Sequence, residues 1–422
     1  MKEKRFSLDS VPFAPEKVVC KKTVPDLCLL LDPNAPNWVI VNDIGREIVL
    51  LVNGERTLGE IAEMQCKKHN AQYEKSVDYI LAFMNELGEK DFIREKPFPP
   101  PTATNKEDFP LSDIWLHVTN RCNLRCIHCH LSSGLPLTDE MAAKEICWII
   151  SEAEKLGVGE VHISGGEPLI RKDILKIVKH ISQHVDSAIL ITNGTLITDR
   201  IAAKLREYHV RVQVSLDGAQ KETNDYVRGK GSYKKTISGL KKLIKAGTPA
   251  RIAMTLMKHN INEIDEMVDL AKKLGLSDLH FPILQMKGRA QENQALIELS
   301  DQDVVAAVRK MQEISTSERI RLSAAESLRR EVEVRVKQDM CGAGISEASV
   351  AANGSIYPCA GLHENEFCAG NIREQTLEDI WKMSEVFTKL RSSSVLDIPE
   401  CRACDFKFLC AGGCHVDKYY AY

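Results

Sequence analysis

Short apolar stretches recur through the middle of the chain, and each is followed by a longer segment whose apolar residues have helical spacing. Short runs of β-branched and aromatic residues are typical of buried strands. The stretches of this kind are residues 114–119, 161–164, 188–192, 212–216, 252–256 and 279–283. Six repeats of a strand and a helix predict an α/β fold with a parallel sheet, either doubly wound or curved into a complete or partial barrel.

The first part of the chain has a different pattern. Three short strand-like stretches lie before residue 43, and three helical patterns follow, the second of which opens with Thr57 and Glu60 as a capping box. We expect a winged-helix-like αβ module at residues 1–95 with a binding role, because it holds no metal motif and no catalytic constellation. Residues 96–110, KPFPPPTATNKEDFP, are rich in proline and polar residues and are expected to form a linker.

Composition narrows the class of protein. The 422 residues are 44% hydrophobic with a formal net charge of -3 and no basic stripe, so we expect no nucleic acid partner. The sequence has no signal-peptide pattern and no run of about 18 apolar residues, so we expect a cytoplasmic protein without a membrane partner. The 14 cysteines, in a chain without an export signal, favour metal or redox chemistry over disulfides.

Three cysteines follow the first predicted strand in the polar sequence RCNLRCIHCH. Cys122, Cys126 and Cys129 have C-x3-C-x2-C spacing, whereas a closed zinc or iron–sulfur site normally has four protein ligands. Zinc could take His128 or His130 as the fourth ligand, and an iron–sulfur cluster could keep one iron open. Both kinds of metal site fit the spacing, while a redox pair would leave Cys122 without a role.

Further motifs follow the next three predicted strands. They are SGGEP at 164–168, TNG at 192–194 and SLDG at 215–218. The carboxyl ends of parallel strands meet at one edge of a sheet, which is where α/β enzymes place their chemistry. We therefore expect the three motifs and the cysteine loop to form one site.

Residues 321–422 are rich in cysteine and glycine and poor in apolar periodicity. Four of the cysteines form a C-x2-C-x5-C-x3-C run from Cys401 to Cys414. A region with this composition is expected to fold around its metals.

The combination of CNLRCIHC, SGGEP and SLDG resembles the radical S-adenosylmethionine (radical SAM) superfamily. The carboxyl-terminal region resembles the auxiliary-cluster extension called SPASM, and residues 1–95 resemble the peptide chaperone of pyrroloquinoline quinone biosynthesis. The resemblance implies a partial (β/α)6 barrel at residues 111–320 and a cysteine-rich SPASM-type domain at 321–422. It also implies a [4Fe-4S] cluster on Cys122, Cys126 and Cys129, whose open iron binds S-adenosylmethionine. Reductive cleavage then yields a 5′-deoxyadenosyl radical that takes hydrogen from the substrate.

The resemblance further implies which residues bind S-adenosylmethionine. They are Gly165, Gly166, Glu167, Asn193, Ser215, Arg228 and the backbone of His128. The glycines would let backbone approach the methionine amino group, Glu167 would accept a hydrogen bond, and the Arg228 guanidinium would match the carboxylate. The alternatives are a helix N-cap for Glu167 and a solvated position for Arg228, while Asp217 is expected to order its own turn.

Polar residues on the predicted strands are candidates for contact with the substrate. They are His117, His162, Gln213 and His280. A catalytic base could be among them, and the alternative is a hydrogen-bonded polar lining of the barrel.

The SPASM pattern implies one or two auxiliary iron–sulfur clusters. It assigns the cysteines to two sets, Cys341, Cys359 and Cys414 in the first and Cys401, Cys404 and Cys410 in the second. The second set needs a ligand further downstream, and no cysteine follows Cys414. Either the chain is cut short of its native end, or Cys368 or another group substitutes, or the site is open.

These features predict an enzyme that modifies a ribosomal precursor peptide, with the leader of that peptide on the first module and an external low-potential electron donor. The expected product is a thioether or carbon–carbon cross-link or a related modification. One alternative is a radical SAM enzyme that acts on a porphyrinoid or other cofactor precursor, or on a folded protein such as a sulfatase. An alternative from another class is an iron–sulfur protein that carries electrons or binds a partner.

Overall fold

The computed structural model describes residues 5–24, 27–35, 37–98, 109–317, 320–324 and 340–420. The chain forms two compact units. The first comprises residues 1–105, 334–341 and 393–413, and the second comprises 106–333, 342–392 and 414–422. Most of the predicted linker lies outside the described residues, and the domain boundaries at 95, 110 and 320 stay predictions.

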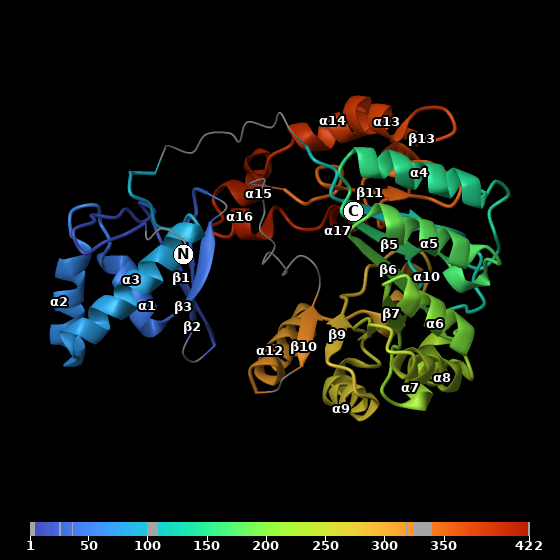
Figure 1. Ribbon diagram of the computed structural model, residues 1–422, viewed down its shortest axis with the longest axis horizontal. Helices are drawn as coiled ribbons and strands as arrows, with labels where there is room; N and C mark the ends of the chain where they lie inside the picture. Colours follow the sequence, from blue (N-terminus) through green and yellow to red (C-terminus); the bar gives the residue numbers. More distant parts are fainter. Residues whose placement is uncertain are drawn as a thin grey trace. The chain divides into compact units, whose positions relative to one another are not determined.

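The first unit contains the expected three strands followed by three helices (Figure 1). Strands β1 (Val19–Val24), β2 (Leu27–Leu31) and β3 (Trp38–Asn42) form an antiparallel sheet in that order. Helices α1 (Asp43–Leu51), α2 (Leu58–His69) and α3 (Tyr73–Glu89) pack on it around a separate apolar core. The capping box is confirmed, because Thr57 Oγ1 accepts from the Glu60 N–H and Glu60 Oε2 accepts from the Thr57 N–H.

The second unit is built on one ten-stranded sheet in the order β10-β9-β8-β7-β6-β5-β4-β11-β12-β13. The six predicted strands are confirmed as a parallel set that follows the chain: β4 (Asp113–His117), β5 (Glu160–Ser164), β6 (Ser187–Thr192), β7 (Arg211–Ser215), β8 (Ala250–Ala253) and β9 (Asp278–Phe281). Strand β10 (Arg321–Ala324) extends it in parallel beyond β9. The result is the expected partial barrel.

Helices cover the outer side of these strands (Figure 1). They are α4 (Ala143–Lys155), α5 (Ile174–His184), α6 (Asp199–Glu207), α8 (Ser232–Lys245), α9 (Ile264–Leu274) and α12 (Asp301–Ser317). The short turns η1 (Pro168–Ile170) and η2 (Ile261–Glu263) precede α5 and α9. Helices α7 (Lys221–Arg228), α10 (Arg289–Glu292) and α11 (Gln294–Ile297) contribute Val227, Ala290 and Ile297 to a separate small apolar cluster. On β4, Ile114 and Leu116 pack into the core with the helices that cover the sheet. Because side chains alternate along a strand, Trp115 and His117 face the inner side. No helix in the described part of the chain is both long enough and apolar enough to cross a bilayer.

Residues 342–392 continue the same sheet. Strand β11 (Glu347–Val350) pairs in parallel with β4, and β12 (Ser355–Tyr357) and β13 (Gly370–Asn371) follow in antiparallel pairing. Helices α13 (Leu377–Met383) and α14 (Glu385–Ser392) bring Trp381 and Phe387 into the core that the barrel strands share. Residues 342–392 therefore have more apolar packing than their sequence pattern indicates, and the expectation that the region folds around its metals stays a prediction. The region's strands and helices are too short to show periodicity, yet their apolar side chains complete the barrel core.

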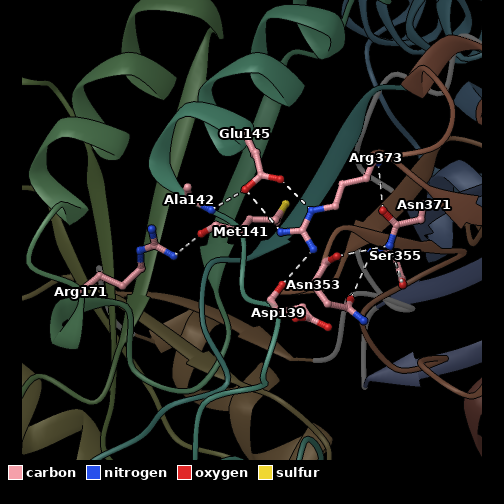
Figure 2. A network of polar contacts seen from close by, with 9 residues as sticks. All are labelled: Asp139, Met141, Ala142, Glu145, Arg171, Asn353, Ser355, Asn371 and Arg373. Atoms are coloured by element: carbon pink, nitrogen blue, oxygen red, sulfur yellow. Dashed lines mark hydrogen bonds and ion pairs between the residues drawn. The ribbon is translucent and has the colours of Figure 1, made fainter.

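An ion-pair network also holds these strands against α4 (Figure 2). Arg373, just after β13, donates from Nε to Glu145 Oε1 at 2.7 Å and from Nη1 to the Asp139 carbonyl at 3.2 Å. Met141 lies in the turn that leads into α4, and its carbonyl accepts a hydrogen bond from Arg171 Nη1 at 2.9 Å. The loop before α4 is thus tied on one side to the barrel and on the other to the β12–β13 hairpin.

The remaining elements are short. They are η4 (Asn365–Phe367), η5 (Val395–Asp397), α15 (Pro399–Arg402), α16 (Lys407–Cys410) and α17 (His415–Tyr420). Within the first unit, Lys17 pairs with Asp405 at 3.0 Å and Lys21 lies over the Phe406 ring. The cysteine run therefore contacts the N-terminal module of the same unit.

Candidate active site

The three-cysteine loop begins directly after β4 and is fixed by groups from a distant part of the chain. Arg289, which is 6% exposed, donates from Nε to the Cys126 carbonyl at 2.8 Å and from Nη1 to the Ser133 carbonyl at 3.0 Å. Asn293 donates to the Ile127 carbonyl at 3.1 Å. Sequence reasoning missed both residues, because no motif marks them and about 160 residues separate them from the loop.

The chemistry of the loop suits an iron–sulfur cluster. Burial raises the pKa of the Cys126 thiol to about 11 and also raises the pKa of Cys122, while the nearby Arg228 charge lowers both. The Leu124 N–H points at Cys122 Sγ over 3.5 Å, as a donor to a ligating sulfur would. A buried thiol with a raised pKa stays protonated near neutral pH, and binding of a metal ion displaces its proton because the thiolate is the ligand. Cys122, Cys126 and Cys129 therefore fit a cluster with three protein ligands.

Gly165 and Gly166 pack against the backbone that leads into Cys122. The Gly166 N–H donates to the Thr119 carbonyl at 2.7 Å, and the next N–H, of Glu167, donates to the Arg121 carbonyl at 2.9 Å. A Cβ on Gly165 would overlap the Thr119 carbonyl, and one on Gly166 would overlap that of Arg121. Gly165 also has a φ of +123°, which L side chains rarely adopt. The two glycines are thus required by the loop itself, and their contact with S-adenosylmethionine stays a prediction.

Glu167 is fully buried and joins the ends of two strands. Its Oε1 accepts from the Leu169 N–H at 3.1 Å and from Thr192 Oγ1 at 2.7 Å, and its Oε2 accepts from the Asn193 N–H at 2.7 Å. Burial raises the pKa of Glu167, while these donors lower it. The N-cap alternative is present, because Glu167 caps η1. Oε2 still has a lone pair for one further donor.

Asn193 connects the TNG motif to the cysteine loop. Its Nδ2 donates to Asn123 Oδ1 at 2.9 Å, and its Oδ1 accepts from the Thr195 N–H at 2.9 Å. Asn123 lies between Cys122 and Cys126, so the ends of β4, β5 and β6 meet as the sequence predicts.

A buried ion pair occupies the end of β7. Arg228 Nε lies 2.6 Å from Asp217 Oδ2, and His128 Nε2 lies 3.2 Å from the same oxygen. Arg228 is 7% exposed, so the solvated alternative for it is wrong. Asp217 does more than order its own turn, since Oδ1 also accepts from the Thr255 N–H at 2.8 Å. The His128 imidazole is held by Asp217, and burial lowers its pKa to about 4.

Comparison with known proteins identifies the family. Three family models match: "Radical SAM superfamily" at residues 116–271, "Iron-sulfur cluster-binding domain" (SPASM) at 341–405, and "Coenzyme PQQ synthesis protein D" at 28–93. An AdoMet-dependent heme synthase of Methanosarcina barkeri is 34% identical over 72% of this chain and 91% of its own. The chain belongs to the radical SAM superfamily. The mycofactocin maturase MftC of Mycolicibacterium smegmatis is 32% identical over 74% of this chain and 80% of its own.

Solved structures have the same fold as this radical SAM enzyme. Streptococcus suis SuiB bound to S-adenosylmethionine aligns with a TM-score of 0.63 at 18% identity, over 97% of this chain and 96% of its own. The protein anSMEcpe with bound AdoMet aligns with a TM-score of 0.58 at 20% identity, over 72% of this chain and 89% of its own. Membership implies a [4Fe-4S] cluster, S-adenosylmethionine and SPASM iron–sulfur chemistry as the cofactors, which removes the zinc and electron-carrier alternatives. The cluster supplies the electron that cleaves S-adenosylmethionine.

The inward polar residues of the barrel differ in their surroundings. Ser215 ends β7 half-buried, and its hydroxyl has no hydrogen bond with a residue that the structure describes. Gln213 accepts from Arg251 Nε at 2.8 Å, and His162 Nε2 lies 3.1 Å from Glu160 Oε1 at the amino end of β5. Gln213 and His162 thus have partners on the barrel strands themselves, as the alternative of a polar lining expects. His117 and His280 are also buried, at 4% and 6% exposure.

The auxiliary cysteines are divided between the two units. Cys341, Cys401, Cys404 and Cys410 belong to the first, and Cys359 and Cys414 to the second. All are half-buried except Cys410, which is exposed. Cys368 is half-buried as well, with its Sγ 3.7 Å from the Gly370 carbonyl. The assignment of these residues to clusters rests on the sequence pattern and stays a prediction.

Proposed function

We propose that this enzyme is a peptide maturase. The 5′-deoxyadenosyl radical would take a hydrogen atom from a ribosomal precursor peptide, and the enzyme would install a thioether or carbon–carbon cross-link or a related modification. The observation that carries the proposal is a PqqD-type module in which β3 is the last strand of the described sheet, on the same chain as a radical SAM barrel. Relatives that cover most of the chain support it, among them the subtilosin biosynthesis protein AlbA of Bacillus subtilis, 25% identical over 90% of this chain and 85% of its own.

The leader of the peptide would bind at β3. This strand lies at one edge of the three-stranded sheet, and Ile40 on it is 53% exposed. Beside it, Ile44 and Tyr79 are exposed, and Phe83 joins them, because its ring stacks on Tyr79 at 6.0 Å and contacts Gly45. An open edge with exposed apolar side chains invites an added strand, whose backbone pairs with β3 while its side chains pack on the apolar residues.

A leader held at β3 would raise the local concentration of the core segment at the barrel. An external low-potential donor would supply the electron that starts the cleavage of S-adenosylmethionine, and therefore belongs to the proposal. A peptide that loses two hydrogen atoms gives one electron back after the hydrogen abstraction, and an auxiliary iron–sulfur cluster would accept it, so the donor primes the enzyme and cross-linking consumes no net electron. A cytoplasmic location, where such donors are available, belongs to it as well.

The test combines product and affinity measurements. Anaerobically reconstituted protein is incubated with S-adenosylmethionine, a reductant and short peptides encoded beside its gene, and mass spectrometry follows the peptides. We expect 5′-deoxyadenosine and a peptide that has lost two hydrogen atoms, and neither from Cys126→Ala. Deoxyadenosine release without change in any peptide would refute the proposal.

A pair of variants tests the leader site. Ile40→Asp should weaken peptide binding about tenfold or more, because it places a charge where an apolar contact forms. Leu50→Asp is the matched control, since Leu50 is 54% exposed on α1 and lies on the groove between α1 and α2. If Leu50→Asp weakens binding and Ile40→Asp does not, the leader binds in that groove and the β3 site is wrong.

A porphyrinoid or other cofactor precursor is the second candidate substrate. It is favoured by the 34% identity to the heme synthase, which aligns over 91% of its own length. That alignment covers only 72% of this chain, whereas SuiB and AlbA cover 97% and 90%. Deoxyadenosine release that a porphyrinoid stimulates and peptides do not would favour this candidate.

A further inference from the structure

Strands β4 and β12 and the loop after β12 carry three aromatic rings that lie close together, and β11, between the two strands, adds a serine. The His117 ring on β4 lies 4.8 Å from the ring of His363, and His363 stacks on Tyr357 of β12 at 4.4 Å with an angle of 15°. Ser349 of β11 fixes the second imidazole, with its Oγ 2.8 Å from His363 Nε2. We call His117, His363, Tyr357 and Ser349 the histidine wall.

His117 lacks the partners that a buried histidine normally has. It is 4% exposed, yet neither ring nitrogen forms a hydrogen bond with a residue that the structure describes. Burial and the nearby charges of His130 and Lys287 lower its pKa to about 3, so the ring is neutral. A neutral imidazole has one N–H donor and one acceptor nitrogen, and neither nitrogen of His117 is among the fully buried polar atoms that lack a partner in the described structure. Both nitrogens are therefore still open to a polar group from outside the described protein.

Other buried side chains in the barrel do not show this feature. His162 pairs with Glu160 at 3.1 Å and stacks on Trp115 at 4.3 Å, and Gln213 accepts from Arg251. These partners come from the protein, as in a structural lining. The second ring nitrogen of His162, Nδ1, has no partner in the described structure, but it is fully buried and so is not open to a group from outside. Of His117, His162 and Gln213, only His117 has no hydrogen bond or ion pair with a residue that the structure describes.

The histidine wall and the cysteine loop share one connecting segment. Lys287 donates from Nζ to the Gly361 carbonyl at 2.8 Å and pairs with Glu364 at 2.8 Å, next to His363. The following residue, Gly288, lies against the cysteine loop, since a Cβ there would lie 2.8 Å from the Cys129 carbonyl. The wall is therefore adjacent to the loop that would hold the radical-generating cluster.

We infer that the histidine wall is a substrate subsite, in which His117 and His363 hydrogen-bond an uncharged donor group of the reacting segment. A backbone amide, hydroxyl, thiol or phenol has this chemistry. The inference rests on the proposed function and adds the residues that hold the peptide next to the radical.

The test measures how tightly S-adenosylmethionine cleavage is coupled to peptide modification, as modified peptide formed per 5′-deoxyadenosine released. The variants are His117→Ala, His363→Ala and His117→Gln, with His184→Ala on helix α5 as the matched control. For each, we measure iron content, S-adenosylmethionine cleavage without peptide, the KM for peptide, and modified peptide per 5′-deoxyadenosine. The peptide is the one that the wild type modifies.

The two alanine variants should keep iron content and peptide-free cleavage within about twofold, while product per deoxyadenosine falls about tenfold and KM rises. His117→Gln should recover part of the coupling, because an amide also offers a donor and an acceptor. The control should match wild type throughout.

Three results would overturn the inference. Unchanged coupling in both alanine variants shows that the wall does not hold substrate. Iron loss with unchanged coupling in the remaining holoenzyme shows a structural role. A wild type that modifies no peptide removes the proposed function and this inference with it, whereas wild-type product with unaffected variants removes the inference alone.

Discussion

Replacing Gly166 by alanine tests whether the glycines of SGGEP serve the cysteine loop. Gly166 does not have a positive φ, so alanine is compatible with its backbone, and the effect comes from contact alone. The new Cβ would lie 2.6 Å from the Arg121 carbonyl carbon and 2.7 Å from the Asn120 oxygen. Contacts under 3.0 Å are essentially never seen, so the Arg121 carbonyl carbon alone must retreat by 0.4 Å. The Arg121 carbonyl oxygen lies closer to the new Cβ than its carbon does, so the backbone has to move further than that.

The expected cost follows from two losses. Forcing a methyl group against rigid backbone costs about 1–3 kcal/mol. Weakening the hydrogen bond from the Glu167 N–H to the Arg121 carbonyl adds about 0.5–1.5 kcal/mol. Together these predict a fall in the Tm of the cluster-free protein of roughly 3–9 °C, because a unit of this size loses about 2 °C per kcal/mol. Because Arg121 precedes Cys122, the shift also displaces the first cluster ligand.

Gly134→Ala is the matched control, since it is the same change in the same loop and its Cβ would meet nothing within 4 Å. The assays are thermal unfolding, iron per chain after anaerobic reconstitution, and release of 5′-deoxyadenosine. Gly166→Ala should lose stability and iron, and Gly134→Ala should lose neither. Equal Tm and iron in both variants would refute the packing argument. Intact iron with lost deoxyadenosine release would instead assign the glycine to S-adenosylmethionine.

Three further substitutions have defined outcomes. Arg289→Ala removes two charge-assisted hydrogen bonds, worth about 1.5–3 kcal/mol each, and should lower the iron retained by the Cys126 loop; full iron retention contradicts this. Glu167→Gln places an NH2 group where the carboxylate accepts hydrogen bonds, and should lower the free energy of unfolding by about 1–3 kcal/mol. The measurement is the Tm of the cluster-free protein, and an unchanged Tm contradicts the prediction. Arg373→Ala breaks a half-exposed pair with Glu145 and should cost less than about 1 kcal/mol, so a fall in Tm above roughly 2 °C contradicts it.

Much of the fold could be predicted from the sequence, because β4 to β9 are apolar and each precedes a helix with clear periodicity. Strands β11 to β13 could not. Their four, three and two residues are too short for a periodic signal, and their place in the sheet depends on pairing between β11 and β4 across more than 200 residues. The same pairing explains why a region rich in cysteine and glycine has an apolar core.

The candidate site was predictable where residues follow strand ends in recognisable motifs. The cysteines, the glycines, Glu167 and Asn193 meet at one edge, as parallel strands require. Arg289 and His363 were not predictable, because each acts through a contact that only the folded chain creates. The ion pair of Asp217 with Arg228 was also missed, because an aspartate before glycine is typical of a turn whether or not it pairs with a distant arginine.

Strand β4 contributes to three features of the second unit: the cysteine loop, the histidine wall and the pairing with β11. Its carboxyl end leads into the cysteine loop, its inner side carries His117, and its outer edge pairs with β11, which carries Ser349. A parallel ladder fixes the register of two strands, because a slip by one residue would turn every side chain to the other face. The ladder between β4 and β11 therefore fixes Ser349 relative to His117, and Ser349 in turn holds His363, which lies in the loop after β12. Radical generation and the histidine wall are placed relative to each other by one ladder and by the Lys287–Gly288 segment, so no flexible hinge separates the two within the described unit.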